Sequence, residues 1–202
     1  MISNKGLYLI LEFEVGGSDG SYYNKFLKIP TVPAWRTTAS GVTVGIGFDC
    51  GQNTPEEIEN SWNDYLSNGD IEKLKSVSGL KGSSAYNSLD KVKGIEISWD
   101  VAKKQFDTYT VPRYYSMAQK RYDNFDLAPW AVREAMVSLT FNRGTSFKGP
   151  SRTEMLEINN LMSQKKWDKI PEQFRKMKRL WPDVKGLIKR REAEAKFIED
   201  NI

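Results

Sequence analysis

The 202-residue sequence contains no histidine and a single cysteine, Cys50. Without histidine the chain cannot form a Ser-His-Asp triad, a Cys-His pair or a histidine-ligated zinc site. One cysteine excludes an intramolecular disulfide and is typical of a protein made in a reducing compartment. A lone thiol is usually a small buried residue, and we interpret Cys50 in that way. Carboxylates are therefore the side chains left to carry protons in a reaction.

Long apolar segments are also missing. No apolar run approaches the roughly 20 residues needed to cross a bilayer, so we expect no membrane span. The apolar stretch of residues 6–13 is interrupted by Glu12 and followed by Glu14, and no small-residue cleavage site comes after it, so it is a poor signal peptide. Hydrophobic residues at 39% and charged residues at 28% are ordinary for a globular protein. We expect a single domain over residues 1–202 that works as a monomer, is made in the cytoplasm and depends on a separate system for export.

Basic residues are concentrated toward the C-terminus. Residues 143–191 contain 14 Lys and Arg against 5 Asp and Glu, whereas the rest of the chain contains 16 basic and 21 acidic residues. A basic surface attracts polyanions, whether nucleic acid or anionic cell wall. The equally ordinary interpretation is a set of solvated helix faces. We expect no nucleic-acid partner, because the sequence contains no recognisable nucleic-acid-binding motif.

The N-terminal segment has helical periodicity. Apolar residues at helical spacing, followed by Gly16, predict a helix over residues 5–15 with Glu14 in its last turn. Residues 18–39 are rich in glycine, proline and aromatic residues, which predicts a long irregular connection, and connections of this length are usually functional.

Residues 42–49 alternate strictly between two kinds of side chain, as in a β-strand or hairpin. One face carries the apolar residues Val42, Val44, Ile46 and Phe48. The other face carries Thr43, Gly45, Gly47 and Asp49. Because six residues of straight strand span roughly 20 Å, Thr43 and Asp49 can serve one site only if the glycines make a sharp bend.

Most of the remaining chain is predicted to be helical. Helix start signals are found at Thr54, Ser98, Pro129, Ser151, Pro171 and Pro182. Those at Thr54 and Ser151 are capping boxes, and the first predicts a helix to about Leu66. A second short strand is expected near residues 94–97. The fold class is therefore α+β and mostly helical, with one small β element after the first helix.

Two segments together carry a family resemblance. The run LILEFEVGG at residues 9–17, followed by SGVTVGIGFD at residues 40–49, resembles the active-site region of phage-type lysozymes and pesticin-like muramidases. Residues 141–144 resemble the end of that family's central helix, and Lys166-Trp167 together with residues 186–197 resemble its C-terminal helices. The resemblance implies a lysozyme-like domain with a β-containing lobe at about residues 15–60 and a helical lobe from the remainder.

The resemblance implies a muramidase that hydrolyses the bond between N-acetylmuramic acid and N-acetylglucosamine in peptidoglycan. Glu14 matches the general acid, Asp49 the second carboxylate of the pesticin-like branch, and Thr43 the residue that orients the attacking water. This chemistry requires one protonated carboxylic acid and a second carboxylate, and no cofactor or metal. A carboxylate at a helix C-terminus faces the negative end of the macrodipole, which favours the protonated form that an acid catalyst needs.

Four further residues have supporting roles by the same resemblance. Gly45 and Gly47 leave the strand face bare, so that a sugar ring can approach the backbone, although a bent edge strand would also explain them. Asn142 matches a residue of the sugar cleft. Arg190 matches an arginine that pairs with the catalytic glutamate.

Several alternatives stay open at the level of sequence. Asp19, five residues after Glu14, is the other candidate for the second carboxylate. Tyr22, Tyr23 and Trp35 are candidates for sugar stacking beside the cleft, although core or rim packing is the commoner role of such residues. The rival activities are a lytic transglycosylase and a non-catalytic wall-binding module. The protein is expected to act on the cell wall or in the periplasm, either as a phage endolysin released by a holin or as a secreted antimicrobial toxin, and a delivered toxin implies an immunity protein.

Overall fold

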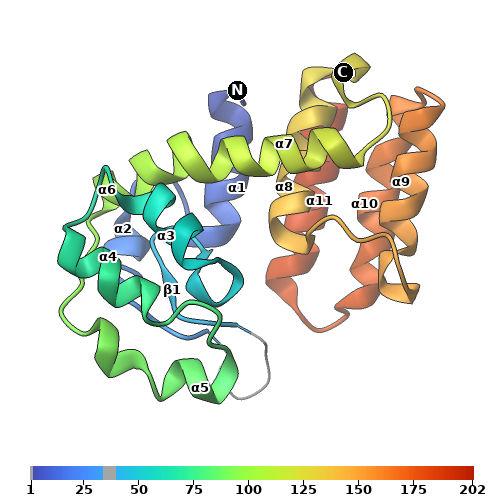
Figure 1. The fold of residues 1–202 in the computed structure, drawn as a ribbon. Coiled ribbons are helices and arrows are strands. Elements are labelled where there is room, and N and C mark those ends of the chain that lie inside the picture. The colour runs from blue at the N-terminus through green and yellow to red at the C-terminus, as the bar shows by residue number, and fades with distance from the viewer. Residues whose placement is uncertain (1, 34–39) are drawn as a thin grey trace. The chain divides into compact units, whose positions relative to one another are not determined.

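A computed structural model describes residues 2–33 and 40–202 (Figure 1). Its contacts divide the chain into two compact units, one made of residues 1–13 and 111–202 and the other of residues 14–110. We call them the helical unit and the hairpin unit. The first helix, α1 (Asn4–Val15), contributes its last two residues to the hairpin unit. The grouping of the whole chain into a single domain stays a prediction.

The hairpin unit contains the described β-strands, which are short and antiparallel. β1 (Thr43–Val44) and β2 (Phe48–Asp49) form a two-stranded sheet, and Thr31 adds an isolated bridge to Thr43. A 3₁₀ turn follows directly at Cys50–Gln52. The helices of this unit are α2 (Ser21–Phe26), α3 (Pro55–Trp62), α4 (Asn68–Lys75), α5 (Gly82–Tyr86) and α6 (Trp99–Gln105). The prediction of a mostly helical chain with one small β element is confirmed.

The helical unit is built around α8 (Trp130–Arg143), which packs against two other helices, α7 (Val111–Arg121) and α11 (Lys185–Glu199). Helix α10 (Ile170–Lys176) packs in turn on α11 and on α9 (Thr153–Ser163) (Figure 1). α8 forms the core of this unit. Its apolar residues Val132, Ala135, Met136 and Leu139 are all inaccessible to solvent. Gly144 ends it with a positive φ of 70°.

Most of the predicted helix starts are confirmed. Thr54 forms a complete capping box with Glu57, Ser98 caps α6, and Pro171 lies in the first turn of α10. Pro129 is the N-cap of α8. Short polar side chains satisfy the exposed amides of a helix start, which is why these signals can be recognised locally.

Other local predictions were wrong. The segment after residue 18 is not wholly irregular, because α2 forms there between Gly20 and Leu27. Residues 94–97 form no strand, and Ile97 makes a single backbone hydrogen bond, to Lys28 O at 2.8 Å. The Ser151 capping box does not form, because Glu154 is bound by Arg179.

Two helix boundaries also differ from the prediction. The helix that starts at Pro55 was predicted to end near Leu66. It ends at Trp62, and turns follow it. The last helix begins at Lys185, three residues beyond Pro182.

A buried ionic cluster connects α8 to α11 in the helical unit. Arg190, Arg191 and Glu194 are at most 2% exposed. Glu194 Oε1 accepts hydrogen bonds from Arg190 Nε at 3.3 Å, Arg191 Nη2 at 3.2 Å and Ser138 Oγ at 2.6 Å. One carboxylate oxygen therefore holds three donors from two helices.

Replacing the central carboxylate of this cluster is expected to destabilise the protein strongly. Glu194→Ala leaves two buried guanidinium groups without that acceptor, which should lower the unfolding free energy by about 3–5 kcal/mol. The matched control is Asp200→Ala at the end of the same helix, because Asp200 pairs with Lys196 at an exposed position and should contribute little. Urea unfolding of the three proteins measures both effects, and equal stabilities for the two variants would contradict the assigned role of the cluster.

Candidate active site

The β-hairpin makes the sharp bend that the sequence required. Gly45 and Gly47 adopt positive φ values of 56° and 70°, which glycine accepts without the steric cost that a Cβ imposes. The chain thereby reverses over three residues, and Thr43 lies directly opposite Asp49 in the antiparallel register. The geometric condition for Thr43 and Asp49 to share one site is therefore met.

The hydrogen bonding of the hairpin brings the Thr43 and Asp49 side chains close together. Cys50 N donates to Val42 O at 2.8 Å, so the neighbouring Thr43–Asp49 pair is of the non-hydrogen-bonded type. In that type the two Cα atoms lie about 4.5 Å apart and the side chains share a face. The predicted apolar set is confirmed, since Val42, Val44, Ile46 and Phe48 are all buried.

Thr31 extends this row of side chains, and the sequence prediction missed it. Its amide and carbonyl exchange hydrogen bonds of 3.0 and 2.7 Å with those of Thr43. A directly opposed pair presents its side chains on one face, so Thr31, Thr43 and Asp49 form a polar row across three segments of chain. Thr31 lies in a segment without strand periodicity, which left no local signal.

Two backbone amides fix the Asp49 carboxylate. Gly51 N donates to Asp49 Oδ1 at 2.8 Å, and Gly41 N donates to Oδ1 at 3.0 Å and to Oδ2 at 3.1 Å. The Thr43 hydroxyl donates to Gly41 O at 3.3 Å. One residue, Gly41, therefore holds both candidate groups, one through its amide and the other through its carbonyl.

This arrangement requires glycine at positions 41 and 51. A Cβ on Gly41 would lie 2.5 Å from both Asp49 Oδ1 and Gly51 Cα. A Cβ on Gly51 would lie 2.8 Å from Gly41 Cα and 3.1 Å from Asp49 Oδ1. Both of these Cβ-to-Cα distances are too short for a real side chain. The backbones at positions 41 and 51 can therefore lie this close together only because both residues are glycine.

The two turn glycines differ in exposure. Gly47 is exposed, as expected for a bare face. Gly45 is buried, and a Cβ there would lie 2.7 Å from the indole of Trp62. The expectation that Gly45 leaves room for a sugar ring is therefore wrong in this respect, because the Trp62 ring already occupies the space.

Glu14 lies in the last turn of α1 and is half-buried. Gly16, with a φ of 72°, ends the helix two residues later, as the sequence predicted. In the hairpin unit Glu14 is therefore held on a regular helix rather than on a loop.

Asn142 and Arg190 belong to the helical unit. Asn142 Oδ1 accepts a hydrogen bond from Arg191 Nη2 at 3.1 Å, so this amide helps to orient the buried arginines. The Arg190 guanidinium lies 5.9 Å from the ring centroid of Phe13, the residue before Glu14. The pairing of Arg190 with Glu14 stays a prediction.

Asp19 and Cys50 have structural surroundings. Asp19 is exposed, and its two carboxylate oxygens accept hydrogen bonds from the amide and hydroxyl of Ser21, which lower the pKa of Asp19. Cys50 is fully buried, as expected, and burial, with a smaller contribution from the charge of Asp49, raises the pKa of its thiol to about 12. The thiol is therefore neutral at physiological pH.

Tyr23 is a core residue. It is inaccessible to solvent, and its hydroxyl donates to Ile97 O at 3.1 Å. Tyr22 is exposed, and Trp35 lies outside the described residues. Of the two tyrosines, only Tyr22 is therefore available to a ligand.

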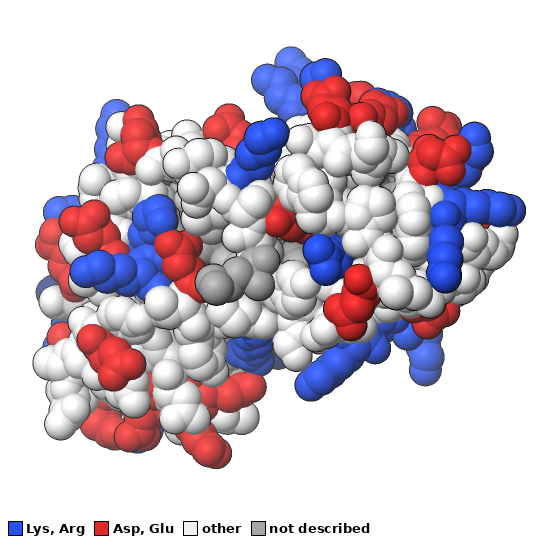
Figure 2. All heavy atoms as spheres, turned by 90° about the horizontal axis from the view of Figure 1, so that it is seen from above, with Lys and Arg blue, Asp and Glu red and all other residues white. Residues whose placement is uncertain are grey.

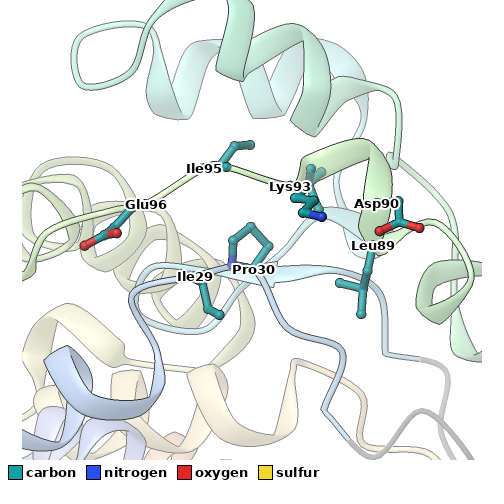
Figure 3. Close-up of a pocket in the computed structure, with 9 residues that line it drawn as sticks. Ile29, Pro30, Leu89, Asp90, Lys93, Ile95 and Glu96 are labelled. Carbon is teal, nitrogen blue, oxygen red and sulfur yellow. The ribbon is translucent and has the colours of Figure 1, made fainter.

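A separate pocket of about 300 Å³ lies in the hairpin unit (Figure 3). Three segments line it, at residues 29–30, 89–90 and 92–96. It contains none of the predicted catalytic residues, and it is mixed in character, with apolar walls and three charged side chains, Asp90, Lys93 and Glu96. We therefore do not place the reaction there.

The two units differ in charge. The helical unit contains 20 basic and 13 acidic residues, whereas the hairpin unit contains 10 basic and 13 acidic residues. On the face drawn in Figure 2 the two signs are interspersed rather than gathered into one patch. That face therefore fits the interpretation of solvated surfaces.

Residues 2–33 and 40–202 contain no helix long and apolar enough to cross a membrane. The same residues contain no group of three or more metal-ligating side chains placed to hold an ion.

Comparison with known families identifies the fold. The chain matches the Pesticin family model, described as a bacterial toxin homologue of phage lysozyme, C-term, over residues 24–177. The fold is thus a lysozyme-like domain. Since the match covers about three quarters of the chain, the protein belongs to the Pesticin family. A search among curated proteins gave no match.

Family membership implies a muramidase-type hydrolase of peptidoglycan that acts on the cell wall. The matched range includes Thr43, Asp49 and Asn142. It begins after Glu14 and ends before Arg190, so the roles of those two residues depend on the local sequence resemblance.

A methyl group at position 41 is expected to break the arrangement around Asp49. Gly41→Ala forces the Asp49 carboxylate or the Gly51 backbone to move, which should lower the unfolding free energy by about 1–3 kcal/mol. The matched control is Gly69→Ala in α4, where a Cβ meets only Ser67 Oγ at 3.8 Å. There alanine should raise the stability by about 0.5–1 kcal/mol, because it favours the helix. Chemical denaturation compares the variants, and a Gly41→Ala protein as stable as the parent would show that the contact is not tight.

Proposed function

We propose that this protein hydrolyses the glycosidic bond between N-acetylmuramic acid and N-acetylglucosamine in peptidoglycan, with Glu14 as general acid and with Asp49 and Thr43 acting on the attacking water. The observation that carries the proposal is the Thr43–Asp49 pair fixed by the Gly41 peptide, in a chain of the Pesticin family. Hydrolysis of a glycoside needs one carboxylic acid and one carboxylate, and the sequence offers no histidine as a substitute.

Asp49 suits the acceptor role. Its Oδ1 receives hydrogen bonds from two amides, whereas Oδ2 shares only the Gly41 amide. A carboxylate oxygen has two lone pairs and can accept more than one hydrogen bond. Oδ2 is the oxygen with acceptor capacity left for water.

Thr43 suits the orienting role. Its side chain lies on the same face as the Asp49 carboxylate, directly opposite it in the hairpin register, and its backbone exchanges two hydrogen bonds with Thr31. A hydroxyl both donates and accepts, so it can hold a water next to the carboxylate while one lone pair of that water points at the sugar. Such fixed positioning removes orientational entropy before the reaction begins.

Glu14 suits the acid role because of its place in the chain. It is half-buried in the last turn of α1, which ends before Gly16, so a regular helix holds its carboxyl group in place. Asp19 is a weaker candidate for the second carboxylate, since it is exposed and caps α2 through Ser21.

Arg190, Asn142, Gly45 and Gly47 are proposed as supporting residues. Arg190 orients Glu14, Asn142 belongs to the sugar cleft through the central helix, and the glycines shape the hairpin that carries Thr43 and Asp49. The Arg190 contact with Phe13 supports its role, because that residue precedes Glu14 on the same helix.

The proposed site of action is the bacterial wall. The family description names a bacterial toxin, which supports a bacteriolytic protein that a separate system delivers to the wall or periplasm. A producing cell that meets its own toxin in that compartment would need an immunity partner.

Charge-removing variants test the assignment of the carboxylates. Glu14→Gln and Asp49→Asn should each lower the release of reducing ends from purified peptidoglycan by about 100-fold or more, because proton transfer is lost. The asparagine amide oxygen can still accept from the Gly41 and Gly51 amides, so Asp49→Asn should stay folded. Asp19→Asn is the matched control, since asparagine also caps helices, and its activity should equal that of the parent.

The opposite pattern would revise the proposal. Activity retained by Asp49→Asn and lost by Asp19→Asn would move the second carboxylate to position 19. A folded parent that releases nothing from peptidoglycan would contradict hydrolysis altogether. Circular dichroism of every variant separates lost chemistry from lost folding.

A further inference from the structure

Helix α2 carries two large aromatic side chains in solvent. Tyr22 is 49% exposed and Phe26 is 50% exposed, and their ring centroids lie 4.8 Å apart. Residues four apart lie on one face of a helix, so the two rings form a continuous surface, which we call the aromatic platform. Two adjacent exposed rings offer an aromatic surface on which a ligand can stack.

The helix beneath the platform is firmly fixed. The intervening Tyr23 is buried, packs on Trp99 at a centroid distance of 5.4 Å and bonds to Ile97 O. Asp19 caps the start of the helix through Ser21. The backbone that carries the platform is therefore held by buried contacts rather than by the two exposed rings.

The platform lies at the end of the helix that carries Glu14. A Cβ on Gly16 would lie 3.2 Å from Tyr22 Cβ and 3.4 Å from its ring. Gly16 follows Glu14 by two residues and ends α1. The Tyr22 side chain thus packs on the backbone next to the proposed acid, within the hairpin unit.

We propose that the aromatic platform of Tyr22 and Phe26 is a binding subsite for a sugar ring of the glycan strand, beyond the ring being cleaved. This inference rests on the proposed function for the identity of the polymer. The axial C–H bonds of a pyranose give it an apolar face with slight positive charge, and the face of an aromatic ring is negative. A sugar can therefore cover the platform while its hydroxyl groups stay in water.

The charge next to the platform fits the same polymer. Lys25 Nζ lies 5.0 Å from the Phe26 ring centroid. The peptide substituents of the wall glycan carry carboxylates, which an exposed ammonium group attracts. The platform therefore combines a stacking surface for the sugar with a cation for the substituent.

Binding can be measured without catalysis. In a Glu14→Gln background, the affinity for chitotetraose and the sedimentation with purified peptidoglycan are measured for Tyr22→Ala and Phe26→Ala. Each should weaken binding by roughly tenfold, the effect of losing one stacking partner. Tyr22→Phe keeps the ring and should rescue binding. The matched control Tyr86→Ala removes a tyrosine that is 43% exposed on α5 and should bind as the parent does.

Each outcome decides the proposal. Unchanged affinity in both alanine variants, no binding by the Glu14→Gln parent, or an equal loss in Tyr86→Ala would overturn the subsite. A loss confined to Tyr22→Ala and Phe26→Ala supports it. The wild-type chain could bind chitotetraose through the platform and yet release no reducing ends from purified peptidoglycan. In that case the proposed hydrolysis fails while the subsite stands.

Discussion

The hairpin unit depends on one interaction, the carboxylate of Asp49 held by the amides of Gly41 and Gly51. It joins Gly41, two residues before β1, to the turn after β2, so it closes the open end of a hairpin whose strands are only two residues long. An isolated hairpin is at best marginally stable in water. The same contact fixes Thr43, whose hydroxyl donates to the Gly41 carbonyl. The interaction that stabilises the hairpin is therefore also the one that places the proposed catalytic groups.

Burial of the apolar face of the hairpin fixes the position of the residues on the polar face. Val42, Val44, Ile46 and Phe48 are buried, and Phe48 packs edge-on against Trp62 at 5.7 Å. Burying a side chain of this size stabilises a fold by about 1.5–3 kcal/mol. This burial fixes the register, because a shift of one residue would turn all four side chains to the opposite face. With the register fixed, the place of Asp49 opposite Thr43 follows from the three-residue turn.

The sequence predicted those features of the fold and of the candidate site that follow from a pattern within one short segment. Strict alternation over residues 42–49 was enough to place Thr43 and Asp49 on one face and to require a bend at the glycines. Gly41, Gly51 and Thr31 were missed because their roles arise from contacts between segments that show no periodicity. Helix α2 was missed because burial of Tyr23 and the Asp19 cap outweigh a glycine-rich and aromatic composition. The failed Ser151 cap has the same origin, since Arg179 binds Glu154 from a distant part of the chain.

The central claim is that water attacks the sugar at this site, and digestion in ¹⁸O-labelled water tests the attack by water most directly. A hydrolase incorporates the label into the new reducing end of each fragment, so the account predicts reducing muropeptides heavier by about two mass units, one oxygen from water for each bond cleaved. A lytic transglycosylase closes the sugar on itself, so its anhydro products contain no label. Unlabelled anhydro ends as the main product would contradict the assignment of Asp49 and Thr43 to the attacking water.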